Sequence, residues 1–222
     1  MSTLTSEQKA TFARDGFLLV PGLIPKHIAA LAEAAMWEAL GASPTDPQTW
    51  EGKPSARGFS EPAITAIFTP EMAALVAEMS EEAAPGWTPP RSAFAINVFP
   101  QAGEWSHHGP HIDHSIERDG YHTFPHPMRL ASLLYLTDCR IGGGATVVWP
   151  GSHTKIEVLA KSDPARFELM FTLNGALKEL DLGEGVQVEG KRGDVLFYHY
   201  LTAHSGSKNV LDYPRFAVAH KW

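Results

Sequence analysis

Residues 193–207 read GDVLFYHYLTAHSGS, and the fold prediction rests on this stretch. Its first half, Val195–Tyr200, is a short apolar and aromatic run of the kind that forms a buried strand, and Gly193-Asp194 bounds it as a turn. Other short runs of this kind follow Pro90 and are separated by turn-forming clusters: Ser92–Phe99, Arg129–Thr137, Ala145–Trp149, Val186–Val188 and Arg215–His220. This pattern predicts an antiparallel sandwich or barrel.

The residues before Pro90 have a helical texture. The capping box Thr5-Ser6-Glu7-Gln8, the Pro25 start and the Thr69 N-cap predict helices, with one short strand between the first two. The expected elements are a helix ending near Asp15-Gly16, a strand over Phe17–Val20, a helix from Pro25 to about Leu40 and a helix from Thr69 to about Ala84. The stretch 42–62 is rich in Pro, Ser, Thr and Gly and predicts a surface loop, and Asp163-Pro164 predicts the start of one later helix.

Helices first and strands later predict an α+β chain, mainly β, with N-terminal helices packed on a β-sandwich core. A length of 222 residues fits one domain, spanning 1–222, with a helical part of about 1–90 and a β part of about 91–222. No internal repeat or low-complexity segment divides it.

The composition narrows the classes of function. A formal net charge of −7 argues against a nucleic-acid-binding face, and no apolar run is long enough to span a membrane. Cys139 is the one cysteine, so an intrachain disulfide is excluded, and the polar segment Met1–Ala10 lacks the apolar core of a signal peptide. We therefore expect a cytoplasmic protein with no nucleic-acid or membrane partner. The sequence does not indicate an oligomeric state.

Histidine is over-represented in one segment. The chain has 11 histidines, and a polar loop could account for the six that fall within 107–126, namely His107, His108, His111, His114, His122 and His126. Their spacing has to decide between a loop and a metal site.

Four residues combine into a more specific pattern. In His111-Ile112-Asp113, the residues two apart point to the same side of an extended segment, so an imidazole and a carboxylate converge. His204 lies just past the Val195–Tyr200 strand, and Arg215 lies 11 residues after His204. Two histidines and one carboxylate are the ligand set of non-haem Fe(II) oxygenases, with open positions for a co-substrate and O₂. The planar fork of an arginine suits an acidic co-substrate.

These residues, with GGATVVWPGSH over 143–153, GDVLFYHYLTAHSGS over 193–207 and GFLLV over 16–20, resemble the phytanoyl-CoA dioxygenase family across about residues 10–221. The resemblance implies a double-stranded β-helix and an Fe(II)- and 2-oxoglutarate-dependent oxygenase that uses O₂. It implies His111, Asp113 and His204 as iron ligands and catalytic centre, and Arg215 as the residue that holds the distal carboxylate of 2-oxoglutarate. The expected activity is hydroxylation of a C–H bond of a small metabolite, with release of succinate and CO₂.

Further site residues follow from position. Asn97 lies on the strand before the metal loop, where the family often places a polar residue near the co-substrate. The family often carries a serine two residues after the distal histidine, but that position is Gly206 here, between Ser205 and Ser207, and we name Ser207 as the candidate contact. The candidates for substrate contact flank the His-x-Asp motif: Trp105, His107, His108 and Arg129.

Two other classes of function stay open at this stage. His111-x-Asp113-His114 overlaps the second half of a dizinc hydrolase motif, although Gly109 stands where the first half needs a histidine. A non-catalytic small-molecule-binding β-sandwich is the other alternative. Succinate formation from 2-oxoglutarate with added Fe(II) would separate all three.

Overall fold

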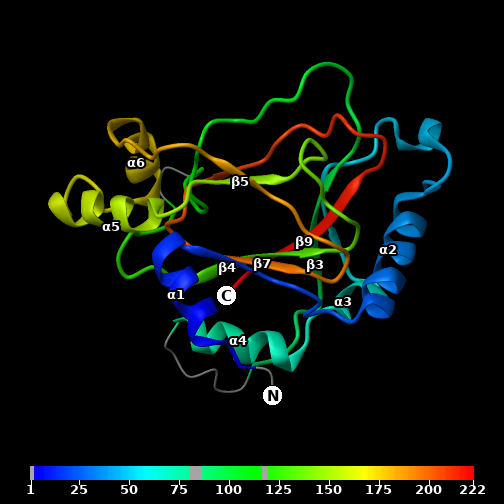
Figure 1. The fold of residues 1–222 in the computed structure, drawn as a ribbon, viewed down its shortest axis with the longest axis horizontal. Helices are drawn as coiled ribbons and strands as arrows, with labels where there is room; N and C mark the ends of the chain where they lie inside the picture. Colours follow the sequence, from blue (N-terminus) through cyan, green and yellow to red (C-terminus); the bar gives the residue numbers. More distant parts are fainter. Residues whose placement is uncertain (1–2, 81–86, 117–119) are drawn as a thin grey trace.

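A computed structural model describes residues 3–80, 87–116 and 120–222. It shows an α+β chain, mainly β, in which two antiparallel sheets face each other as a double-stranded β-helix (Figure 1). The larger sheet has the order β1-β7-β4-β9-β3-β2, formed by Phe17–Val20, Val195–His199, Leu130–Tyr135, Arg215–Lys221, Ala93–Val98 and Ala56–Phe59. The smaller sheet has the order β6-β5-β8, formed by Val186–Val188, Thr146–Val148 and His204–Ser205.

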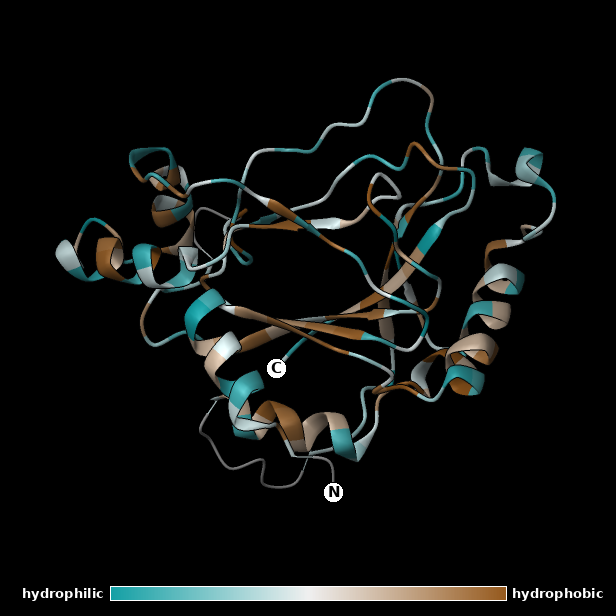
Figure 2. Cartoon of the chain, viewed as in Figure 1, coloured by the Kyte–Doolittle hydropathy of each residue, from teal (hydrophilic) through white to brown (hydrophobic). Residues whose placement is uncertain are grey.

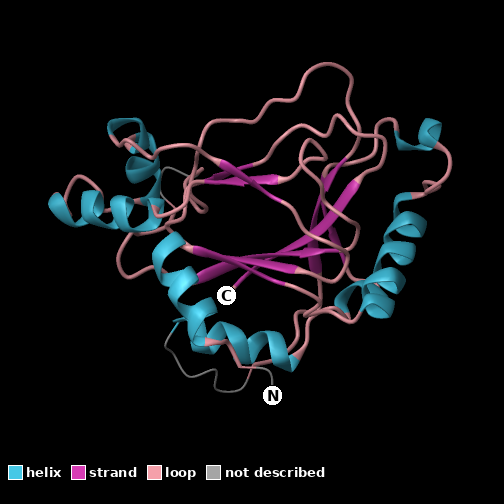
Figure 3. Cartoon of the chain, in the orientation of Figure 1, coloured by secondary structure: helices cyan, strands magenta, loops and turns pink. Residues whose placement is uncertain are grey.

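The helices lie around the outside of the two sheets (Figure 3). The longer ones are α1 (Ser6–Asp15), α2 (Lys26–Leu40), α4 (Pro70–Ser80) and α5 (Ser152–Ser162). The short ones are α3 (Pro62–Thr65), α6 (Met170–Gly175) and the 3₁₀ turns η1 (Pro47–Trp50) and η2 (Leu177–Glu179). In the part of the chain that the structure describes, no helix is both long enough and apolar enough to cross a membrane.

The larger sheet has two differently used faces, because side chains alternate along each strand. Its outer face buries Phe197, Phe216 and Val218 together with apolar residues of the N-terminal helices, such as Met36 and Met72. Its inner face turns a second set toward the smaller sheet, including Leu133, Leu196 and Ala217. The central strands of the larger sheet are accordingly mostly brown, the hydrophobic end of the scale, in Figure 2. The candidate site lies on the inner face, between the sheets.

The expected strands are confirmed, with ends shifted by a few residues. The capping box is also confirmed, since the Thr5 side chain accepts from the Gln8 backbone and the Gln8 side chain accepts from the Thr5 backbone. The helix expected over Thr69–Ala84 is described as α4 to Ser80, and its expected end lies outside the described residues.

Two expectations about local structure were wrong. The stretch 42–62 is not only loop, because Ala56–Phe59 pairs as β2 with β3 at the sheet edge. Three of those four residues are exposed, and the sequence Ala-Arg-Gly-Phe shows no alternating apolar pattern that would indicate a strand. The later helix does not start at Asp163-Pro164: α5 starts at Ser152 and Asp163 is its C-cap. This helix is indicated in the sequence by Ile156 and Ala160, which lie four residues apart and are buried on one helix face.

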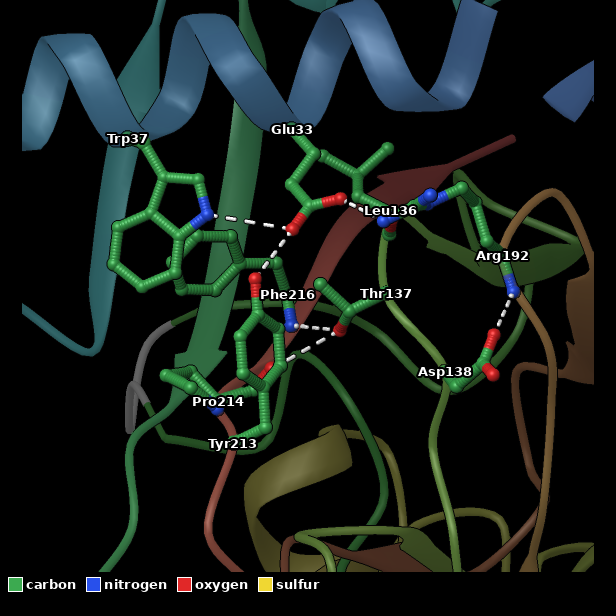
Figure 4. Close-up of polar contacts among 9 residues, drawn as sticks. All are labelled: Glu33, Trp37, Leu136, Thr137, Asp138, Arg192, Tyr213, Pro214 and Phe216. Atoms are coloured by element: carbon green, nitrogen blue, oxygen red, sulfur yellow. Dashed lines mark hydrogen bonds and ion pairs between the residues drawn. The ribbon is translucent and has the colours of Figure 1, made fainter. Parts of the chain in front are cut away.

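A buried carboxylate joins α2 to the larger sheet (Figure 4). Glu33 is 6% exposed and accepts hydrogen bonds from Trp37 Nε1 at 3.3 Å and from the Tyr213 hydroxyl at 2.9 Å. Its other oxygen pairs with the Arg192 guanidinium, whose Nε donates to the Leu136 carbonyl at 3.0 Å. These contacts fix the loops that lead into β7 and β9.

Thr137 fixes the first residues of β9 directly (Figure 4). Its hydroxyl donates to the Pro214 carbonyl at 3.1 Å and accepts from the Phe216 backbone N–H at 2.8 Å. Pro214 and Phe216 are the two neighbours of Arg215, so Thr137 sets the backbone position from which the Arg215 side chain starts.

Candidate metal centre

Three side chains converge between the sheets. His111 and Asp113 come from the connection between β3 and β4, and His204 opens β8. One ligand atom from each lies within 4.8 Å of the others, and His204 Nε2 is 3.8 Å from Asp113 Oδ1. The backbones of His111 and His204 exchange two hydrogen bonds of 3.0 and 2.9 Å, which lock together segments 93 residues apart. Within the described ranges, this is the one group of three or more His, Cys, Asp or Glu residues with metal-ligand spacing.

A hydrogen bond sets the orientation of His204. Its Nδ1 lies 3.0 Å from the Thr202 carbonyl, which can only accept, so Nδ1 carries the proton. Nε2, the other ring nitrogen, then lies on the side of Asp113. Fixing the second ring nitrogen in this way is typical of metal-binding histidines.

The charge states of the other two residues also suit a cation. Burial and the neighbouring His204 lower the pKa of His111 to about 4, so its imidazole is neutral at neutral pH. Burial alone would raise the pKa of Asp113, but the facing His204 and Lys221 outweigh it, so the pKa is lowered and the group is a carboxylate. A neutral imidazole and an ionised carboxylate are ligand forms that bind a divalent metal.

Arg215 lines the same cavity, of about 240 Å³, as the three converging residues. It is only 2% exposed, and neither Nε nor Nη1 has a hydrogen-bond partner. Among the described residues, no carboxylate oxygen forms a salt bridge with it. An unpaired buried guanidinium is costly, and an anion bound in this cavity would offset that cost.

Tyr198 lies on the inner face of β7 and also lines this cavity. Its hydroxyl donates to Asp113 Oδ2 at 3.4 Å, and burial raises its pKa well above the ordinary value, so the phenol keeps its proton. The apolar and aromatic run Val195–Tyr200 predicts a buried core strand, yet Tyr198 of this run faces the cavity. The alternation of side chains along the strand could have indicated this position for Tyr198. Leu196 and Tyr198 share the inner face, while Phe197 points into the outer core.

The structure does not bring Asn97 to this cavity. Asn97 alternates with Phe94 and Ile96, which line the cavity, so its side chain belongs to the other side of β3. It is fully buried there, and both of its side-chain polar atoms lack a partner. Ser207 is also turned away, since its hydroxyl donates to the Ala145 carbonyl at 2.6 Å. At the position where the family often has serine, Gly206 lines the cavity.

The substrate candidates next to the His-x-Asp motif lie elsewhere. His107 and His108 line a separate groove of about 730 Å³, which they share with Ser207 and the segment after Trp50. Trp105 lies beside His107, with ring centroids 5.5 Å apart. Arg129 donates to the His126 carbonyl at 2.5 Å and lines neither this groove nor the cavity of Arg215.

His114 does not join the converging group. Its backbone has a φ of 60°, and its ring stacks on Tyr121 with centroids 3.8 Å apart. The left-handed backbone at His114 redirects the chain directly after Asp113, so the tetrapeptide His111–His114 presents two ligands to the site.

A double-stranded β-helix with two histidines, one carboxylate and a buried arginine on its inner face defines the class of non-haem Fe(II) oxygenases. The model of the phytanoyl-CoA dioxygenase (PhyH) family matches residues 12–217. The chain therefore belongs to the phytanoyl-CoA dioxygenase family of Fe(II)- and 2-oxoglutarate-dependent oxygenases. Comparison with the curated proteins gives no match.

Solved structures support the fold. The α-ketoglutarate-dependent carbocyclase SnoK from nogalamycin biosynthesis is 18% identical, with a TM-score of 0.64 over 97% of this chain and 82% of its own. EvdO2 from Micromonospora carbonacea var. aurantiaca is 17% identical, with a TM-score of 0.64 over 98% of this chain and 90% of its own. EctD from S. alaskensis is 15% identical, with a TM-score of 0.64 over 97% of this chain and 75% of its own.

Proposed function

We propose that this protein hydroxylates a C–H bond of a small metabolite, converting 2-oxoglutarate and O₂ to succinate and CO₂. The single observation that carries the proposal is the pairing of a metal-ligand triad with a buried, unpartnered guanidinium in one cavity. A metal site alone would need no such arginine. A 2-oxo dicarboxylate satisfies both, because one end can chelate a metal and the other can pair with Arg215.

Each of the four site residues has a role in the proposed reaction. His111, Asp113 and His204 would hold Fe(II) through their converging ligand atoms. Arg215 holds the distal carboxylate of 2-oxoglutarate through the two nitrogens that lack partners. Iron, when bound, supplies the one-electron chemistry that lets O₂ react with 2-oxoglutarate and a C–H bond.

The other side chains that line the cavity exclude water and orient the Asp113 carboxylate. Apolar side chains of the larger sheet, such as Ala131, Leu133 and Ala219, line the cavity around the triad. Excluding water strengthens the pairing of Arg215 with its carboxylate and limits side reactions. Tyr198 donates to Asp113 Oδ2 and holds the carboxylate plane in place.

Two observations weigh against the other candidate functions. A dizinc hydrolase would use His114 as a ligand, but the His114 ring stacks on Tyr121 outside the converging group. A non-catalytic binder has no use for an open-sided metal triad next to an anion site.

The test has to separate hydroxylation from other outcomes, because the similar structures include the carbocyclase SnoK and the epimerase SnoN. Purified protein with Fe(II), 2-oxoglutarate and ¹⁸O₂ is incubated with a metabolite extract, and succinate and new products are measured by mass spectrometry. We expect substrate-dependent succinate and a product that gains one ¹⁸O atom. His111→Ala should lose both signals, and His122→Ala, a change at an exposed histidine that lines neither cavity of the triad, is the matched control that should keep them. A product that lost two hydrogens or kept its mass would contradict hydroxylation, and no succinate at all would contradict the proposed function.

A further inference from the structure

A second cavity reaches the triad from another side. It has a volume of about 340 Å³ and touches His111 and Asp113, and it is further lined by His114, Tyr121 and Lys221. Arg215 is not among its described lining residues, whereas Arg215 lines the first cavity. The triad thus lies between two spaces, and only one of them contains the anion site that we assign to 2-oxoglutarate.

Lys221 brings a positive charge to the second cavity, and it also lines the first cavity beside Asp113. It ends β9 on the same face as Arg215, six residues along the strand, which separates the two backbones by roughly 20 Å. The two cations therefore start from distant points of β9, and we assign only Arg215 to 2-oxoglutarate. The Lys221 ammonium lies 3.7 Å from Asp113 Oδ1, and its side chain is 40% exposed, so it is open to a ligand from solvent.

An aromatic wall faces the same space. The His114 and Tyr121 rings stack at 3.8 Å with an interplanar angle of 15°, and Tyr121 is 39% exposed. Ile116, 90% exposed, adds an apolar side chain to the same lining. A flat ring and an exposed aliphatic side chain suit a planar or apolar ligand body.

We propose that this second cavity binds the molecule to be oxidised, and that this molecule is small and anionic with a planar or apolar body. Lys221 pairs with its carboxylate or phosphate, and the wall formed by Tyr121, His114 and Ile116 covers its body. An anion fits because a metal bound by Asp113 takes up the charge that otherwise balances Lys221. The inference rests on the proposed function, since it assigns the first cavity to 2-oxoglutarate.

The test uses the full chain loaded with Mn(II) and saturated with 2-oxoglutarate under nitrogen, so that nothing turns over. The probes are benzoate, phenyl phosphate and the neutral benzamide, with binding followed by calorimetry. Relaxation of the probe ring protons by Mn(II), against a Zn(II)-loaded sample, reports whether the bound probe lies beside the metal. Binding of 2-oxoglutarate is measured in the same samples.

We expect at least one anionic probe to bind beside the metal more tightly than benzamide. Lys221→Met should weaken that probe by roughly ten- to a hundredfold, as for loss of a charge-assisted hydrogen bond. Lys221→Arg should retain it, and Lys161→Met, a change at an exposed lysine of α5, should have no effect. In all variants, metal binding should not weaken and 2-oxoglutarate binding should stay unchanged.

Three results would overturn the inference: no preference for the anions, an unchanged anion affinity in Lys221→Met, or competition between the probe and 2-oxoglutarate for one site. If Lys221→Met weakened metal binding instead, Lys221 would be a counter-ion of Asp113 only, and the inference would be wrong. Loss of 2-oxoglutarate binding by the unmodified protein is a separate result, which would count against the proposed function.

Discussion

Replacing Arg215 with methionine should have opposite effects on ligand binding and on folding stability. The side chain is 2% exposed, and two of its nitrogens have no partner in the ligand-free protein. Each charge-assisted hydrogen bond to a carboxylate contributes about 1.5–3 kcal/mol, so two of them give about 3–6 kcal/mol. The Kd for 2-oxoglutarate should therefore rise by roughly a hundred- to ten-thousandfold in Arg215→Met.

The free energy of unfolding of the ligand-free protein should stay the same or increase in this variant. Removing an unpaired buried charge in favour of an apolar side chain of similar volume is neutral or stabilising by about 1–4 kcal/mol. Calorimetry with Mn(II) and 2-oxoglutarate measures the first effect, and urea unfolding of the metal-free protein measures the second. A Kd for 2-oxoglutarate within about threefold of the unmodified value would show that Arg215 does not form two charge-assisted hydrogen bonds with it. Marked destabilisation of the ligand-free variant would instead show that Arg215 is a structural residue.

Three further variants test the site and its surroundings. Thr137→Val leaves the Phe216 N–H without its acceptor, so we expect a loss of about 1–3 kcal/mol in urea unfolding and weaker 2-oxoglutarate binding; equal Kd values would mean that Thr137 does not position its neighbour. His111→Ala should abolish Mn(II) binding measured by electron paramagnetic resonance, whereas His114→Ala should keep it, and the reverse order would show that the ligands are wrongly assigned. Burial lowers the pKa of His199 to about 4, so the unfolded chain binds a proton that the folded chain does not, and stability should fall by up to about 3 kcal/mol from pH 6.5 to 4. In His199→Gln this part of the pH slope should disappear from urea midpoints, and an unchanged slope would show that His199 does not cause it.

The converging residues were predictable because their signals are local. In His111-x-Asp113 the spacing of two places both side chains on one side, and the apolar run before His204 marks it as following a strand. The resemblance to the family then indicated Arg215 by its interval from His204. The structure brings all of these to one cavity.

Other parts of the site depend on which face of the sheet a residue occupies. Asn97 lies on the expected strand β3. Successive side chains of a strand point to opposite faces of the sheet, and the sequence does not show whether the even- or the odd-numbered residues of this strand face the cavity. His107 and His108 are close to His111 in sequence, yet they line a different groove. Lys221 is far from Asp113 in sequence, and only the pairing of β9 with β4 places it beside the triad.

In the proposed function, one metal and one 2-oxoglutarate share the cavity of His111, Asp113, His204 and Arg215. A crystal structure from crystals grown with Fe(II) and 2-oxoglutarate under nitrogen, with anomalous data at the iron edge, tests it most directly. We expect an iron peak bonded to His111, Asp113 and His204, with the distal carboxylate of 2-oxoglutarate on Arg215. An iron peak bonded to His114, or a 2-oxoglutarate whose distal carboxylate lies on another residue, would contradict it.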